Sequence, residues 1–275
     1  MSYFAVGGNL GYALGPLITT PVVLTLGLSA TPLIAIPGLI AAALITRELP
    51  RVRRHLHAGE QTVKQASRIP AEKQAWTPFW RLVAVIVMRS VPFFALVALV
   101  PIYLLRHFHT NAWLAGFALT LMLFGGAAGT LVGGRCADLF GRKKVMIGAM
   151  VPLTLLLLLL RYVGLTEFIV VLVGVGLTLE GPFSTTVLLG QEYLPGRVGL
   201  ASGVTYGLAI GLGGMLGSAL GALADATSVS FVISLMPIFA ALAVVLTISL
   251  PKPADALLAA RQAHDDAAGS GGPVA

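Results

Sequence analysis

Two charged residues lie deep inside apolar segments, and their types suit the binding of protons or anions. Arg89 is about ten residues from the start of its segment near Phe79, and Glu180 is eleven residues before Gln191, where its own segment ends. At about 1.5 Å per residue both lie about 15 Å deep, which is the middle of a bilayer core of about 30 Å. Charges at that depth are costly and usually functional. We therefore predict that Arg89 and Glu180 bind substrate or protons. The alternative is an ion pair that only holds two helices together.

Other kinds of chemical site are not predicted. The sequence contains no HExxH, GxSxG or Walker string, so we expect neither an enzyme nor a bound cofactor. His55 with His57, and His107 with His109, have a spacing that can bind a metal, but no cysteine or carboxylate lies near either pair. We expect solvated loop histidines and no metal site. Cys136 is the single cysteine, which excludes an internal disulfide.

The composition shows that membrane spans must position the two charged residues. The chain of 275 residues is 57% apolar and only 11% charged, whereas about a quarter of a soluble domain is charged. The 32 glycines suit helices that approach closely in lipid. The net charge of +7 does not indicate nucleic-acid binding, because the basic residues lie in short gaps between apolar runs rather than on one solvated face.

The apolar runs predict an all-α polytopic membrane protein with about eight transmembrane helices. The second run is short and contains Pro32 and Pro37, so we expect it to begin with a kink or an irregular turn. The runs cover approximately residues 3–28, 31–46, 79–105, 112–133, 145–163, 166–190, 198–223 and 229–250.

The polar segments divide the chain and orient it. Residues 47–78 are predicted to form a basic cytoplasmic linker, and residues 251–275 a cytoplasmic tail with a short amphipathic helix followed by disorder. Lys and Arg residues fall fifteen on one side of the predicted spans and two on the other, with Arg89 inside a span. Short cytoplasmic loops retain positive charge, so the first side and both termini are predicted to be cytoplasmic.

The string GGRCADLFGRKK, at residues 133–144, lies between two predicted spans. Its glycines permit a tight turn between helices, and Asp138 lies where it can cap the N-terminus of a neighbouring helix. The string resembles motif A of the major facilitator superfamily, although Leu139 stands where that family often has a basic residue. A positively charged loop with an incidental aspartate is the alternative. The matching residues are Gly134, Asp138, Gly141, Arg142, Lys143 and Lys144.

Two further strings strengthen this resemblance. In GGNLGYALGP, residues 7–16, the residues Gly11, Gly15 and Pro16 match the end of motif C, which marks the fifth of twelve helices in exporters that exchange drug for proton. One more span and a basic linker follow before the spans that precede motif A, as the family order requires. The string QEYLPGRVGLASG at 191–203, together with VGGNLG at 6–11, is similar to the fosmidomycin resistance group of the superfamily.

The resemblance implies a fold and a role. Residues 1–46 would be the last two helices of an N-terminal bundle, and residues 79–250 a six-helix C-terminal bundle, so four earlier helices of the parent protein would be missing here. It places the helices of Arg89 and Glu180 beside the central cavity. The implied function is proton-coupled efflux of small drug-like or anionic compounds across the plasma membrane, with lipid, substrate and protons as partners. The alternative is a non-transporting membrane fragment with a structural or interaction role.

The charges at the cytoplasmic turn are predicted to act together. We expect Asp138 to approach the N-terminal end of the first helix and Arg142 to approach Glu192, because a helix start and a carboxylate each attract the opposite charge. Glu192 and Arg197 complete this predicted cytoplasmic charge latch. The alternative is a set of solvated charges with little effect on stability.

Overall fold

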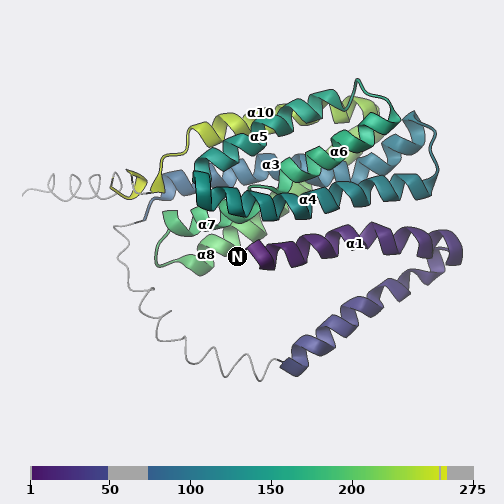
Figure 1. Ribbon diagram of the computed structural model, residues 1–275, viewed down its shortest axis with the longest axis horizontal. Helices are drawn as coiled ribbons and strands as arrows, with labels where there is room; N and C mark the ends of the chain where they lie inside the picture. Colours follow the sequence, from purple (N-terminus) through teal and green to yellow (C-terminus); the bar gives the residue numbers. More distant parts are fainter. Residues whose placement is uncertain (1, 49–73, 254, 259–275) are drawn as a thin grey trace, which may run out of the picture.

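The computed structural model describes residues 2–48, 74–253 and 255–258. Every regular element in these ranges is helical, as the composition predicts (Figure 1). Six helices in the described part are long and apolar enough to cross a membrane. Helix α5 has 18 residues and begins with three basic ones, and the apolar part of α1, Leu10–Leu26, is shorter. The predicted number of about eight spans therefore fits loosely.

Two helices precede the main bundle, and only the first packs against it. Helix α1 (Ser2–Leu26) runs alongside α4, and a 3-10 helix, η1 (Leu28–Ile34), then reverses the chain after Gly27, whose φ is 77°. The helix at 35–48 slants away from the bundle in Figure 1, and all of its side chains are exposed. The predicted irregular start is confirmed at Pro32, while Pro37 lies within regular helix.

Five helix pairs make the most extensive contacts in the described structure. Helix α4 packs chiefly on α6 and α1, α3 packs on α9 and α10, and α5 packs on α10. Side-chain caps begin two of the helices: Asn111 Oδ1 accepts a hydrogen bond from the Leu114 N–H, and Ser228 Oγ accepts one from the Phe231 N–H. The helices are α3 (Trp76–His107), α4 (Ala112–Phe140), α5 (Arg142–Leu159), α6 (Leu165–Glu180), α7 (Phe183–Tyr193), α8 (Val198–Gly203), α9 (Ala209–Ala226) and α10 (Val229–Ile248).

The apolar run 166–190 lies within one candidate membrane span, Leu165–Tyr193, as predicted, but the helix is interrupted inside this span. Helix α6 ends at Glu180 and α7 begins at Phe183, with Gly181 and Pro182 between them. Proline lacks an N–H group, and its ring clashes with the carbonyl four residues earlier, so a helix breaks or kinks there. The break leaves carbonyl groups at the end of α6 that need partners from elsewhere in the bundle.

Glycines on α4 allow it to touch the backbone of α6. A Cβ atom built on Gly129 would overlap the Leu177 carbonyl, and one built on Gly133 would overlap the carbonyl of Gly181. Close backbone contact through small residues is the usual way to pack helices in lipid, because lipid provides no hydrophobic driving force between helices. The α4–α6 contact is the most extensive helix pair of the bundle.

Two glycines of the run that begins at Gly211 pack α9 against α3. Gly213 on α9 lies against Ser90 of α3, and Gly217 lies against Phe94. The same span is interrupted before α9 by a π-helical turn, Val204–Leu208, so the predicted run 198–223 is α8, this turn and then α9. Such turns are rare and occur often at functional sites.

The polar segments are described only in part. Helix α3 already begins at Trp76, so residues 76–78 are helical rather than the end of the predicted linker. The remaining linker prediction falls chiefly on residues 49–73, which lie outside the described residues. In the tail, residues 255–258 are helical and Ala256 is buried, whereas the predicted disorder concerns residues outside the described ranges.

Candidate functional site

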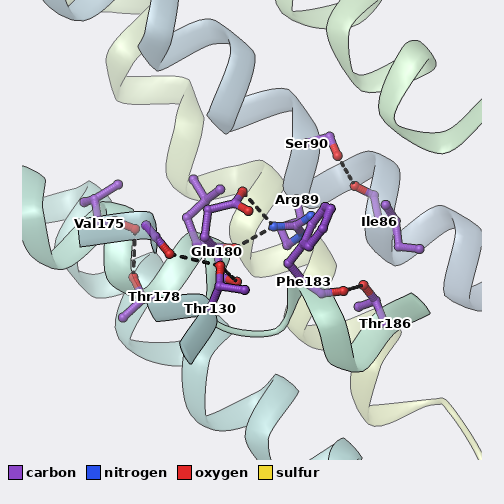
Figure 2. A network of polar contacts seen from close by, with 11 residues as sticks. Ile86, Arg89, Ser90, Thr130, Val175, Thr178, Glu180, Phe183 and Thr186 are labelled. Carbon is purple, nitrogen blue, oxygen red and sulfur yellow. Dashed lines mark hydrogen bonds and ion pairs between the residues drawn. The ribbon is translucent and has the colours of Figure 1, made fainter. Parts of the chain in front are cut away.

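Arg89 and Glu180 bind each other inside the bundle. Arg89 Nη1 lies 3.2 Å from Glu180 Oε1, and the two side chains are 3% and 9% exposed (Figure 2). Arg89 comes from the middle of α3, and Glu180 is the last residue of α6. At about 1.5 Å per residue, Arg89 is about 20 Å along the helix from Trp76 and about 27 Å from His107. The pair therefore lies well away from both ends of the bundle.

The helix break gives Arg89 a second hydrogen-bond partner. Arg89 Nη1 also donates a hydrogen bond of 2.6 Å to the carbonyl of Leu179, one of the groups left without a helical partner by the break at Pro182. One guanidinium group thus binds both the carboxylate and the open end of α6. Thr130 of α4 donates to the Gly126 carbonyl at 3.0 Å and lies 3.4 Å from the carbonyl of Glu180.

The surroundings of the pair combine an aromatic ring with close helix packing. The Arg89 guanidinium lies over the ring of Phe183 at 5.6 Å, as Figure 2 shows, and Phe183 contacts Tyr206 of the π-helical turn edge-on. A Cβ atom on Gly126 would lie 3.0 Å from Glu180 Cγ, so α4 confines the carboxylate side chain. Cation–π contact with a desolvated guanidinium is worth about 2 kcal/mol.

The pair offers two chemical functions. Glu180 is a carboxylate that can take up a proton, and its protonation would remove the charge that balances Arg89. Arg89 Nε is buried and has no hydrogen-bond partner among the described residues. The guanidinium therefore holds a further donor for an acceptor group of a ligand.

The predicted motif C residues line a separate cavity. A cavity of about 490 Å³ lies between α1 and α3 and is bordered by Gly11, Gly15 and Pro16 and by aromatic rings of both helices. Tyr12 and Phe93 meet edge-on across it, with ring centroids 6.3 Å apart. Arg89 and Glu180 are not among its lining residues, although Phe93 is one helical turn further along α3.

The motif A string is mostly helix rather than loop, which corrects the predicted turn. Helix α4 continues to Phe140 and contains Gly134, so Gly141 alone makes the turn to α5, with φ of 88°. This end of the bundle, where α4 ends and α5 begins, is called the basic end below. Asp138 is exposed and forms no hydrogen bond or ion pair within the described ranges, so the predicted contact with the start of α1 is not formed there.

Three basic residues at the basic end have partners from other elements. Arg142 forms an ion pair with Glu192 at the end of α7, as predicted. Lys143 Nζ donates to the carbonyls of Ile248 and Leu250, at 2.7 and 2.6 Å, and so caps the end of α10. Arg197, predicted to act with Glu192, instead lies over the ring of Trp76 at 5.7 Å. Arg142 and Glu192 both belong to helices of the main bundle.

The Arg142–Glu192 pair is expected to contribute little to stability. Its side chains are 32% and 42% exposed, and exposed pairs are typically worth 0.2 to about 1 kcal/mol because solvent and salt screen them. A double-mutant cycle of Arg142→Gln and Glu192→Gln, followed by thermal unfolding, should give a coupling of about 0.5 kcal/mol that disappears at about 1 M salt. A coupling above about 2 kcal/mol, unchanged by salt, would contradict this expectation.

The sequence analysis did not predict the helix break or the groups that Arg89 contacts there. The partners of Arg89 other than Glu180 are a backbone carbonyl and an aromatic ring, and neither has a charge or spacing signature. The dipeptide Gly181-Pro182 within an apolar run was the available signal, because such pairs mark helix ends. The Gly181-Pro182 dipeptide and the predicted depth of Glu180 together indicate that the carboxylate lies at a break in its helix.

Comparisons with known proteins identify the family of the chain. Residues 84–270 match the model of the Major Facilitator Superfamily. The chain is 30% identical over 254 residues to the fosmidomycin resistance protein of Escherichia coli (strain K12), with 91% of this chain covered. It is 31% identical over 258 residues to the uncharacterized MFS-type transporter YfnC of Bacillus subtilis (strain 168), with 89% covered. The chain spans 62% of the length of each relative. The family match covers more than half of the chain, and we conclude that the chain belongs to the Major Facilitator Superfamily.

Proposed function

We propose that the protein to which this chain belongs is a secondary active transporter that exports small drug-like or anionic compounds, driven by inward flow of protons. Membership of the superfamily and the similarity to a protein named for fosmidomycin resistance support this proposal. Because the chain spans 62% of those relatives, the activity is that of the whole protein, including any helices that lie beyond this chain.

The observation that carries the proposal is the buried Arg89–Glu180 pair at the broken end of α6. Taking two charges out of water costs several kcal/mol per ion, and an apolar pair of similar volume often packs as well. Ionisable residues within membrane spans are accordingly rare and mark pathways for ions or substrates. A carboxylate that can take up a proton, next to a cation with a further donor, is suited to coupling.

The pair also relates the charge of the substrate to the direction of coupling. A proton and a donor group of a substrate compete for the Glu180 carboxylate, and such competition produces exchange of one for the other. An anion bound at Arg89 requires the opposite, because Glu180 must be protonated to release the guanidinium. Proton-driven export is therefore proposed for compounds, anionic ones included, that present a donor group to Glu180, whereas an anion bound only at Arg89 would not be exported by this exchange.

The basic end is proposed to face the cytoplasm. Helix α1 begins and α10 ends at this end of the bundle (Figure 1), and Lys143 binds the carbonyl of Ile248, the last residue of α10. Positively charged residues are retained on the cytoplasmic side of short loops. The proposed location is the plasma membrane. The Arg142–Glu192 pair is proposed to favour one arrangement of the helices at this end.

The proposal is tested with Glu180→Gln in the full-length protein. Glutamine keeps the shape and a hydrogen-bond acceptor for Arg89 but cannot exchange a proton. In cells that lack the native gene, full-length protein should restore growth in fosmidomycin or another drug of a panel. Glu180→Gln should reduce proton-driven efflux at least about tenfold, which corresponds to 1.4 kcal/mol in the transport barrier.

Glu167→Gln is the matched control, because Glu167 is exposed in the first turn of the same helix, α6. Glu167→Gln should transport like the wild type. Glu167→Gln and Glu180→Gln should be present in the membrane in equal amounts. Unchanged proton-driven efflux in Glu180→Gln would refute the role of the pair. Full-length protein that exports no drug of the panel would instead favour a structural or interaction role.

A further inference from the structure

A groove between α4, α5 and α6 lies apart from the Arg89 side chain. It has a volume of about 440 Å³ and is almost entirely apolar. Phe140 and Lys144 border it at the basic end, and Gly129 and Leu177 border it further inside the bundle. The groove exists because α4 touches the backbone of α6 while α5 packs chiefly on α10.

The α5 side of the groove is open. A Cβ atom built on Gly148, which lines the groove, meets no atom within 4 Å. A larger side chain at this position would therefore extend into the groove without displacing a neighbour. Cys136, the only cysteine of the chain, lines the same groove from α4 and is partly exposed.

The length of the groove matches one leaflet of a bilayer. Its α4 wall extends from Gly129 to Phe140, which at about 1.5 Å per residue is about 16 Å. Half of a hydrocarbon core of about 30 Å is about 15 Å. An extended acyl chain with its headgroup at the basic end thus fits along this wall.

Lys144 supplies a positive charge at the mouth of the groove. Of the three consecutive basic residues, Arg142 is paired with Glu192, and Lys143 binds carbonyls of α10. Lys144 is exposed and forms no hydrogen bond or ion pair within the part of the chain that the structure describes. Asp138, the acidic residue nearest to it in sequence, does not line the groove.

We propose that this groove binds an anionic phospholipid, with one acyl chain along α4 and the phosphate group on Lys144. Burial of the chain in an apolar groove and the attraction of Lys144 for the phosphate act at the two ends of one molecule, so the site selects both the shape and the charge of its ligand. Basic pockets between membrane helices bind anionic headgroups in this way. The proposal does not depend on transport.

Native mass spectrometry of the full chain in detergent tests the proposal with phosphatidylglycerol and phosphatidylcholine as probes. We expect the wild type to retain one phosphatidylglycerol in preference to phosphatidylcholine. Lys144→Met should weaken this retention about fivefold, the effect of one basic residue near an anionic surface. Gly148→Leu, which fills the groove, should weaken the retention of both lipids. The controls are Lys252→Met, an exposed lysine outside the groove, and Gly211→Leu, an open position on α9; both should retain lipid like the wild type.

Modification of Cys136 with a maleimide provides a second measurement. Added phosphatidylglycerol should slow the reaction in the wild type and in Lys252→Met, but less in Lys144→Met. Equal retention of the two lipids by the wild type would overturn the proposal. So would wild-type retention in both Lys144→Met and Gly148→Leu, or a reaction of Cys136 that is unaffected by phosphatidylglycerol. None of these outcomes bears on drug export, so the proposed function stands or falls separately.

Discussion

Replacing Arg89 by methionine is expected to destabilise the protein by about 3 to 5 kcal/mol, because it leaves the Glu180 carboxylate buried without its ion partner. The side chains concerned are 3% and 9% exposed, so water cannot readily take the place of the guanidinium. The Leu179 carbonyl loses a hydrogen bond of 2.6 Å in the same variant. Thermal unfolding of the purified protein in detergent measures the loss. A variant as stable as the wild type would show that the link between α3 and the end of α6 is not essential for stability.

The double variant Arg89→Met with Glu180→Leu separates a structural pair from a functional one. It removes both charges and replaces them with apolar side chains, so most of the stability should return, apart from about 1 kcal/mol for the lost bond to Leu179. If the pair serves proton or substrate binding, the refolded double variant remains inactive in proton-driven efflux. Recovery of both stability and efflux would show that Arg89 and Glu180 only hold the helices together.

Replacing Gly133 by alanine is expected to destabilise the bundle by about 3 kcal/mol or more. The added Cβ atom would overlap the carbonyl of Gly181, which belongs to the backbone and cannot turn away as a flexible side chain would. Helix α4 must then move away from α6, which disturbs the most extensive helix contact and the Thr130 contacts at the end of α6. The measurement is the yield of folded, monodisperse protein and its unfolding temperature.

Gly211→Ala is the matched control for this prediction. Gly211 lies within α9, and a Cβ atom there meets no atom within 4 Å. Alanine should be tolerated, and its higher helix propensity favours it by up to about 1 kcal/mol. If Gly133→Ala is as stable as Gly211→Ala, the close approach of α4 and α6 is not a requirement of the fold.

The sequence alone was sufficient to predict which segments are mainly helical, but not the interruptions within them. Long apolar runs must be helical in lipid, because every backbone N–H and C=O group has to be satisfied within its own segment. The missing N–H group of proline likewise predicted the irregular turn at Pro32. The prediction was wrong at α4, where the motif A string continues as helix to Phe140 because Gly141 alone suffices for the turn.

The sequence also predicted that Arg89 and Glu180 lie at a similar depth, because depth follows from counting residues along a helix. It left open whether the two side chains meet, since the rotation of each helix about its axis depends on its neighbours. The same applies to the basic end, where the pairing of Arg142 with Glu192 was predicted but the stacking of Arg197 on Trp76 was not.

Only the tertiary structure determined the partners and the open spaces. Breaking α6 at Pro182 leaves carbonyl groups free, but the packing of α3 decides that Arg89 reaches one of them. In the same way, the composition of α4, α5 and α6 does not reveal a groove, because the groove results from the close contact of α4 with α6 and the packing of α5 chiefly on α10. Helix formation in lipid is governed by local hydrogen bonding. Ion pairs and cavities depend instead on how separate helices pack together, and the residue order along one helix does not specify that packing.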